Sequence, residues 1–337
     1  YTSYPTAPHF SPKVGPVEFS EGLRNLSPSQ ALSLYVHVPF CAQLCWYCGC
    51  NTKATRNSDT IETYLQHLLT EILMVAAVVP GARPLGHIHW GGGSPNSLSA
   101  DQIRRLAETL HTSFAMRADT EFAVEIDPRW LDQDQIKAFA AAGVNRASVG
   151  VQDFNPQVQS AINRVQSVEM TERAVNGMRE AGVKGVNIDL VYGLPHQTEE
   201  SVANTIEEVI RLAPDRIALF GYAHLPSRAK HQSMIDETTL PGTMERYRQS
   251  RRAEHLLIEA GYVTVGLDHF ARPDDALASG EIKRNFQGYT TDKADALIGV
   301  GASSISQLPT GYYQNAVPRA DYERRVSDTG LATVRGI

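Results

Sequence analysis

Three glycines recur in similar surroundings along this chain: Gly143 in AAGVNRASVG, Gly182 in EAGVKGVNIDL and Gly261 in EAGYVTVG. In each segment the residues before the glycine favour a helix, and an apolar run that suits a strand follows it. Glycine fits this point because it adopts the left-handed conformation that ends a helix at no steric cost. The chain therefore repeats a helix-to-strand unit, which is typical of parallel α/β proteins.

Short apolar runs alternate with amphipathic helices from residue 31 onward. We expect the first helix to begin at the capping pair Asp59 and Glu62, and the second at Ser99 with Gln102 in the capping-box position. Six runs are expected to form parallel strands, at residues 34–38, 87–90, 122–126, 147–151, 186–191 and 216–220.

Six such units on roughly 190 residues fit an open, partial version of the eight-unit TIM-like barrel, that is, a partial (β/α)6 barrel of the α/β class. A doubly wound sheet is less favoured, because no Gly-rich dinucleotide fingerprint follows the first strand. We assign residues 1–30 to an N-terminal extension, 31–225 to the barrel core and 226–337 to C-terminal additions. These additions should contain a helix near 244–259, a strand at 263–265 and turns around Gly288 and Gly311. A further helical domain is expected beyond Ile337.

Composition narrows the possible partners. The net charge is −6 and the sequence has no block of Lys and Arg, which argues against nucleic acid because backbone binding needs concentrated positive charge. The longest apolar run, residues 72–79, is far shorter than the ~20 residues that span a bilayer. No export signal is visible at the start. We expect a monomeric, cytoplasmic protein that does not bind membranes.

All four cysteines lie within ten residues, in the run CAQLCWYCGC. Disulfides packed so closely would cross-link almost nothing, whereas a metal could gather the thiols at one point. Cys41, Cys45 and Cys48 can bind three irons of a [4Fe–4S] cube and leave the fourth iron open. A structural zinc site is the alternative, although such sites usually draw on two separated ligand pairs. Cys50 is either a fourth ligand or a thiol with a separate role.

Polar residues and glycines follow other predicted strands, at the ends where barrels of this kind place their active sites. The run GGGSP at residues 91–95 is expected to leave backbone N–H and C=O groups open to a small molecule with an amino acid moiety. Glu125 and Asp189 fall within predicted strands, where carboxylates are costly unless paired. Binding of a cation or of ribose hydroxyls explains them better than a core position; a solvated strand end is the alternative.

Together these segments resemble the radical S-adenosylmethionine superfamily. The blocks that carry the resemblance are LYVHVPFCAQLCWYCGCN, HWGGGSPN, VEIDP, GVQDF, NIDLVYGLP and GYAHLP. YTSYPTA at residues 1–7 and the CxC that ends the cysteine run are more specifically similar to the oxygen-independent coproporphyrinogen III oxidases (coproporphyrinogen dehydrogenases) of heme biosynthesis. The resemblance covers essentially the whole chain.

The resemblance implies that Cys41, Cys45 and Cys48 hold the cluster, and that Cys50 is required without being a ligand. Cys50 and Tyr35 are the implied catalytic residues. A first S-adenosylmethionine would chelate the open iron and lie against Tyr35, Gly91, Glu125, Ala223 and Ile305. A second S-adenosylmethionine would lie at Gly92, Gly93, Ser94, Gln152, Arg164 and Asp189.

The implied reaction converts two propionate side chains of coproporphyrinogen III into vinyl groups, giving protoporphyrinogen IX. Two S-adenosylmethionine molecules would become methionine and 5′-deoxyadenosine, with an electron donor such as flavodoxin or ferredoxin. Arg272, Lys283 and Arg284 are candidate partners of the substrate carboxylates, and His269 belongs either to the pocket or to the core. The alternatives are a heme-binding, chaperone-like protein, a heme-modifying relative, and electron transfer through a fully ligated cluster.

Overall fold

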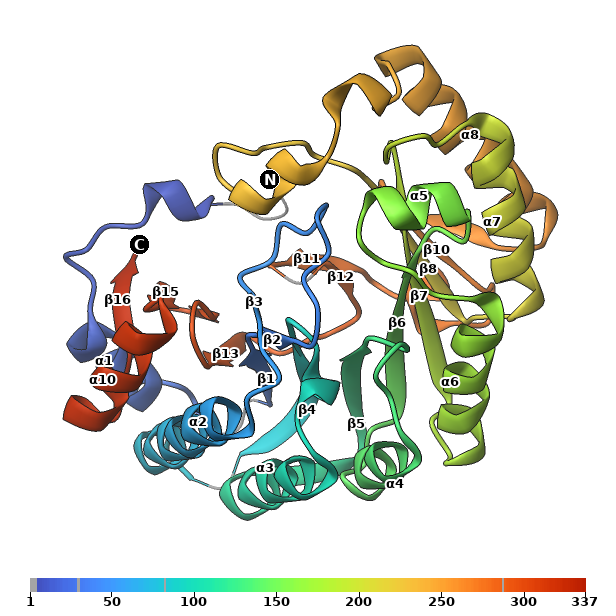
Figure 1. Cartoon of the computed structure of the whole chain (residues 1–337). Coiled ribbons are helices and arrows are strands. Elements are labelled where there is room, and N and C mark those ends of the chain that lie inside the picture. The colour runs from blue at the N-terminus through green and yellow to red at the C-terminus, as the bar shows by residue number, and fades with distance from the viewer. Residues whose placement is uncertain (1–4, 29–30, 82, 287) are drawn as a thin grey trace.

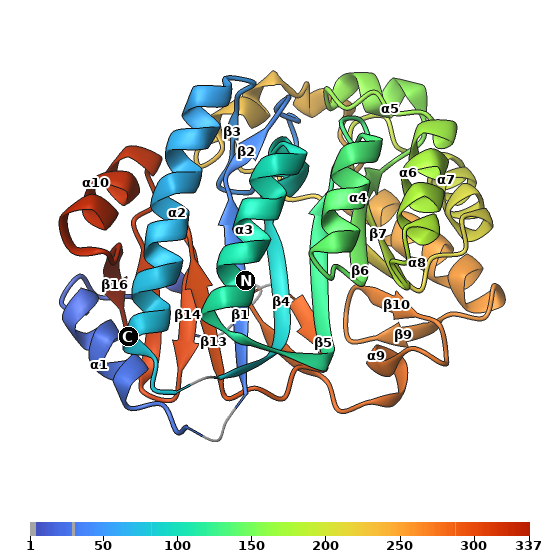
Figure 2. The same ribbon diagram turned by 90° about the horizontal axis from the view of Figure 1, so that it is seen from below.

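The computed structural model describes residues 5–28, 31–81, 83–286 and 288–337. Residues 1–4 of the block YTSYPTA therefore lie outside the described part of the chain. The fold is built on a 12-stranded sheet in the order β16-β15-β14-β13-β1-β4-β5-β6-β7-β8-β10-β9. This sheet curves into an open barrel, with most helices on its outer face (Figures 1 and 2).

The central strands of the sheet are all parallel. They are β1 (Leu32–Val38), β4 (Pro84–Gly92), β5 (Ala115–Ile126), β6 (Arg146–Gln152), β7 (Gly185–Tyr192) and β8 (Arg216–Gly221). The six predicted strands are thus confirmed, and so is the partial barrel; five strands have slightly longer bounds, whereas β5 begins at Ala115, well before the predicted residue 122. The sequence analysis missed β13 (Ala296–Val300), which pairs with β1 in parallel and makes a seventh parallel strand.

Helices follow the parallel strands, and most of them pack on the outer face of the sheet (Figure 2). They are α2 (Ser58–Val78), α3 (Ala100–Ser113), α4 (Gln133–Ala141), α5 (Pro156–Ala161), α6 (Val168–Glu180), α7 (Glu199–Arg211) and α8 (Thr243–Glu259). The helix-ending role of Gly143, Gly182 and Gly261 is confirmed, because their φ angles are +90°, +96° and +91°.

The start of α2 differs from the prediction. Its N-cap is Asn57, whose side chain accepts a hydrogen bond of 2.8 Å from the backbone N–H of Thr60. Asparagine caps a helix as well as aspartate does. Glu62, expected in the cap, instead accepts hydrogen bonds from Gln102 and Arg105 of α3.

Helix α2 is also long and apolar enough to cross a membrane, judged by length and composition alone. In this fold it packs on the sheet and buries a face that includes Tyr64, Leu65, Leu68 and Ile72. Its apolar character is therefore explained by the core of the protein.

The C-terminal segment extends the same sheet with antiparallel strands. These are β9 (Val263–Val265), β10 (His269–Ala271), β14 (Ile305–Leu308), β15 (Gly311–Asn315) and β16 (Thr333–Gly336). The predicted strand at 263–265 and helix near 244–259 are confirmed. The predicted turns around Gly288 and Gly311 are also confirmed, because each glycine is the first residue of the second strand of a hairpin, and Gly311 directly follows the turn at Pro309 and Thr310.

Smaller elements complete the fold. Two short sheets pair β2 (Phe40–Cys41) with β3 (Lys53–Ala54), and β11 (Lys283–Asn285) with β12 (Gly288–Thr290). The remaining helices are α1 (Pro16–Arg24), α9 (Ala276–Ser279) and α10 (Arg319–Thr329), with 3-10 turns at Ala7–His9, Pro95–Ser97, Lys230–Met234 and Glu237–Thr239. The proposed boundaries at residues 30 and 225 remain sequence predictions, and the main sheet continues past the second.

A buried carboxylate, Glu71 of α2, ties this helix to the C-terminal segment. One of its oxygens accepts hydrogen bonds of 2.7 Å from the backbone N–H of Gly301 and from the Tyr322 hydroxyl. The other oxygen accepts a bond of 2.6 Å from Asn315 Nδ2. Burial nevertheless raises the pKa of Glu71 from 4.5 to about 7.

This raised pKa predicts a stability that falls as the pH rises. A proton held more tightly in the folded state stabilises it fully below pH 4.5, and that contribution is lost as the pH rises through 7. Glutamine does not titrate, so Glu71→Gln should not lose this stability. Between pH 5 and pH 8, the free energy of unfolding of the variant should therefore rise by about 2 kcal/mol relative to that of wild type. Urea denaturation at both pH values measures this difference.

Glu62→Gln is the matched control on the same helix. Hydrogen bonds from Gln102 and Arg105 lower the pKa of Glu62, so this variant should show no such relative gain at the higher pH. Parallel stability profiles for wild type and Glu71→Gln would contradict the assignment.

Candidate active site

Cys41 ends β2, and the other three cysteines lie on the loop between β2 and β3, beyond the carboxyl end of β1. Parallel pairing of Cys41 with Ala54 brings the two ends of this loop side by side. The Thr52 hydroxyl lies 3.2 Å from Cys41 Sγ. The loop is therefore closed by a short piece of sheet, which holds the cysteines at the predicted face of the barrel.

One cavity collects most of the site residues that the sequence predicted. Its lining includes Cys41, Cys45, Cys48, Cys50, Gly92, Gly93, Ser94, Glu125, Gln152, Arg164 and Asp189. They come from the cysteine loop, from the ends of β4 to β7, and from the segment after α5. The fold thus brings together residues that are up to about 150 positions apart in the sequence.

Four predicted site residues lie outside the lining of this cavity. Tyr35 of β1 stacks on the ring of His89, with ring centroids 5.8 Å apart. Gly91 packs so tightly on Glu125 that a Cβ there would lie 2.6 Å from its Oε1. Ala223 follows β8 and accepts a hydrogen bond from Gln232 Nε2, and Ile305 begins β14. The roles of these four residues in the site remain predictions.

The thiols differ in their electrostatic surroundings. Burial raises the pKa of Cys41 to about 12. The neighbouring Cys50 lowers the pKa of Cys48 to about 7, and the backbone N–H of Cys50 lies 3.4 Å from Cys48 Sγ. The Cys48 side chain in turn raises the pKa of the Cys50 thiol well above its usual value.

The arrangement of the thiols fits a multi-iron cluster. Across the described residues, no three His, Cys, Asp or Glu side chains converge on one point as ligands of a single metal ion would. A cube attaches its cysteines to different irons, so their sulfur atoms must be spread around a shared space. Cys41, Cys45 and Cys48 surround one cavity in this way, and thiolate is the donor that iron–sulfur clusters take.

The glycine turn after β4 packs directly on the cysteine loop. The N–H of Gly93 donates to Val38 O at 2.8 Å, and that of Ser94 donates to Phe40 O at 2.7 Å. The N–H of Gly92 donates to Glu125 Oε2 at 3.0 Å. The expectation that these N–H groups are open to a ligand is therefore wrong, because neighbouring backbone and Glu125 already accept them.

The two strand carboxylates also have partners within the protein. Glu125 Oε1 lies 3.1 Å from His89 Nε2. Burial by itself raises the pKa of Glu125, but its contacts with His89 and the N–H of Gly92 outweigh burial, so the pKa is lowered. Asp189 accepts hydrogen bonds of 2.8 Å from Ser148 and from Asn187, while burial raises its pKa to about 6. Both carboxylates face the cavity, and their role in ligand binding remains a prediction.

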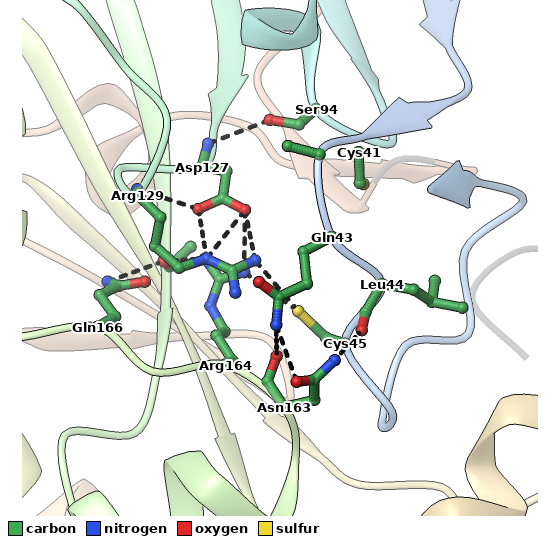
Figure 3. A network of polar contacts seen from close by, with 12 residues as sticks. Cys41, Gln43, Leu44, Cys45, Ser94, Asp127, Arg129, Asn163, Arg164 and Gln166 are labelled. Carbon is green, nitrogen blue, oxygen red and sulfur yellow. Dashed lines mark hydrogen bonds and ion pairs between the residues drawn. The ribbon is translucent and has the colours of Figure 1, made fainter. Parts of the chain in front are cut away.

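The sequence analysis did not assign a role to Asp127 or Arg129, which form a buried network with Arg164 (Figure 3). Arg129 and Arg164 both pair with Asp127, at 2.7 Å and 3.4 Å, and both approach Cys45 Sγ. The signal in the sequence was the Asp-Pro-Arg triplet directly after a strand that carries a predicted ligand-binding carboxylate.

The three candidate carboxylate-binding residues lie outside the lining of both the cavity at the cysteines and a second one inside the barrel. Arg272 and Lys283 are exposed, and Arg272 lies 3.7 Å from Asp274. Arg284 approaches the Asp268 carboxylate at 3.4 Å and lines no part of the cavity. His269 does line a second cavity inside the barrel, where its ring meets Phe220 edge-on and its Nδ1 lies 2.7 Å from Asp268.

Known proteins match the chain over its whole length. The family model of the radical SAM superfamily matches residues 35–209. The oxygen-independent coproporphyrinogen III oxidases of Bradyrhizobium diazoefficiens and Escherichia coli are 47% and 43% identical to it; each alignment covers the entire chain and 76% and 74% of the relative. The solved structure of coproporphyrinogen III oxidase from Escherichia coli, described as a radical SAM enzyme, superposes with a TM-score of 0.96 over 100% of this chain and 78% of that one.

The packing of the glycine turn predicts the effect of adding one methyl group. A Cβ at Gly93 would lie 2.6 Å from Phe40 O and 2.7 Å from Phe40 N, both backbone atoms. Gly93→Ala should therefore displace the cysteine loop and lower the iron bound per chain by at least several-fold. Gly86→Ala within β4 is the control, because the atoms nearest to its Cβ lie 3.9 Å away. Equal iron content in the two variants would contradict this account.

Proposed function

The chain belongs to the radical SAM superfamily and, within it, to the oxygen-independent coproporphyrinogen III oxidases, and from this premise we propose how its residues serve that activity. The observation that supports the proposal is the gathering of Cys41, Cys45 and Cys48 with Glu125 around one cavity at the carboxyl ends of the strands. Such an edge is where barrels of this type act on their substrates.

Radical SAM enzymes use a [4Fe–4S] cluster and S-adenosylmethionine. When bound, this pair would supply the one-electron cleavage of the sulfonium into methionine and a 5′-deoxyadenosyl radical, which becomes 5′-deoxyadenosine by taking a hydrogen atom from a propionate side chain of the substrate. We assign the cluster to Cys41, Cys45 and Cys48. Cys50, which touches Cys48 and is exposed, serves turnover without being a ligand.

Two S-adenosylmethionine molecules are proposed to bind beside the cluster. The first lies against Tyr35, Gly91, Glu125, Ala223 and Ile305, and the second against Gly92, Gly93, Ser94, Gln152, Arg164 and Asp189. Gln152 supports the second placement because it has a φ of +71° at the end of β6. A strained backbone of this kind persists where surrounding structure enforces it, often at ligand sites.

The substrate is coproporphyrinogen III, and the proposed products are the two vinyl groups of protoporphyrinogen IX. Of the two interpretations of His269, a pocket residue is the one we propose, because it lines a cavity that reaches Glu125 and Asp189. The reaction also requires that water be excluded from the cavity, because a carbon radical is highly reactive. Reduction by a flavodoxin or ferredoxin, a monomeric state and a cytoplasmic location complete the proposal.

An anaerobic assay tests the function directly. Reconstituted protein, dithionite, S-adenosylmethionine and coproporphyrinogen III should give 5′-deoxyadenosine together with a product that has lost two carboxyl groups, both detected by mass spectrometry. A methylated or ring-opened product would favour a heme-modifying enzyme. Stoichiometric heme binding without turnover would favour a chaperone-like carrier.

Cysteine variants test the assignment of the ligands. Cys45→Ala should lose the cluster, measured as iron and sulfide per chain, and with it all turnover. Cys50→Ala should keep wild-type iron content but lose turnover at least tenfold, and it is the matched control within the same loop. Loss of iron in both variants would make Cys50 a ligand, and zinc in place of iron would overturn the proposal.

A further inference from the structure

Two guanidinium groups set Cys45 apart from the other proposed ligands. Arg129 Nη2 lies 3.4 Å and Arg164 Nη1 lies 3.5 Å from Cys45 Sγ (Figure 3). Cys41 has a neutral neighbour in the Thr52 hydroxyl, and Cys48 has the backbone N–H of Cys50. Cys45 is therefore the proposed ligand whose sulfur both guanidinium groups contact.

A single carboxylate, Asp127, holds both guanidinium groups. Its Oδ2 lies 2.7 Å from Arg129 Nη2 and 3.4 Å from Arg164 Nη1, and its Oδ1 accepts a hydrogen bond of 2.9 Å from Arg129 Nε. Ser94 and Asn96 fix the strand end, because their side-chain oxygens accept the backbone N–H of Asp127 at 3.3 Å and 3.0 Å. These contacts give the two guanidinium groups a defined position beside Cys45.

The charges in this network do not cancel. The side chains of Arg129, Asp127 and Arg164 are only 5%, 8% and 6% exposed, and two cations with one anion leave a buried charge of +1. Burying an unbalanced charge is costly unless a counter-charge lies nearby. A ligand thiolate at Cys45 is such a counter-charge.

We propose that Arg129 and Arg164 raise the reduction potential of the cluster through Cys45, and that Asp127 limits this effect. The inference rests on the proposed function, because it requires a cluster on Cys41, Cys45 and Cys48. Reduction transfers one electron from a one-electron donor and adds one negative charge to the cluster. Nearby cations and N–H donors to a ligand sulfur stabilise that charge, which makes the cluster easier to reduce.

Opposite charge changes within the network should shift the potential in opposite directions. In Arg129→Gln a cation is lost, so at the wild-type midpoint the ratio of reduced to oxidised cluster should fall about tenfold, or about 59 mV for one electron. In Asp127→Asn an anion is lost, so the same ratio should rise. Redox titration followed by electron paramagnetic resonance, without added S-adenosylmethionine, measures both.

Arg117→Gln is the matched control, because Arg117 pairs with Asp119 at 2.8 Å near the start of β5 but is exposed. Its potential should equal that of wild type. If Arg129→Gln assembles too little cluster to titrate, Arg129→Lys and Asp127→Asn decide the question: the lysine variant should stay near the wild-type potential, and the asparagine variant should rise.

The outcomes separate this inference from the proposed function. Unchanged potentials, or a fall in both Arg129→Gln and Asp127→Asn, would overturn the inference, since general loosening of the site gives no opposite signs. A wild-type protein that assembles no iron–sulfur cluster would instead overturn the proposed function. A fall in one variant and a rise in the other would establish the electrostatic role.

Discussion

The close approach of the β4 turn to the cysteine loop is the contact on which the rest of the site depends. Gly93 and Ser94 donate their N–H groups to the backbone at Val38 and Phe40, and a side chain at residue 93 would collide with that backbone. This packing fixes the loop over the mouth of the barrel. The cavity, its thiols and the end of β5 with Glu125 take their relative positions from it.

The buried charged groups around this contact are not all balanced by opposite charges. Glu125 and Asp189 are satisfied by neutral or weakly basic donors, whereas Asp127 is outnumbered by two guanidinium groups. In a medium of low polarisability such imbalances act over short distances on any bound group. The three thiols therefore offer a cluster three different surroundings, although they belong to one short loop.

The C-terminal segment is part of the same structural unit as the strands that precede it. β13 pairs with β1, the strand that leads into the cysteine loop, so the segment after residue 225 supports the site from the side. Glu71 links α2 to Gly301, Asn315 and Tyr322. This arrangement explains why a long apolar helix such as α2 carries a buried carboxylate.

The sequence by itself determined the repeated βα unit, the six parallel strands and the grouping of the cysteines, because periodicity, helix-ending glycines and ligand spacing are local properties of the chain. It also identified the family, since many ordered blocks match. Only the tertiary structure decided that β13 joins β1, that Asn57 caps α2, that the glycine N–H groups are already bonded, and that Arg129 and Arg164 reach Cys45. Each of these depends on which distant backbone or side chain lies opposite, and residues more than 260 positions apart, such as Leu32 and Ala296, meet only after folding.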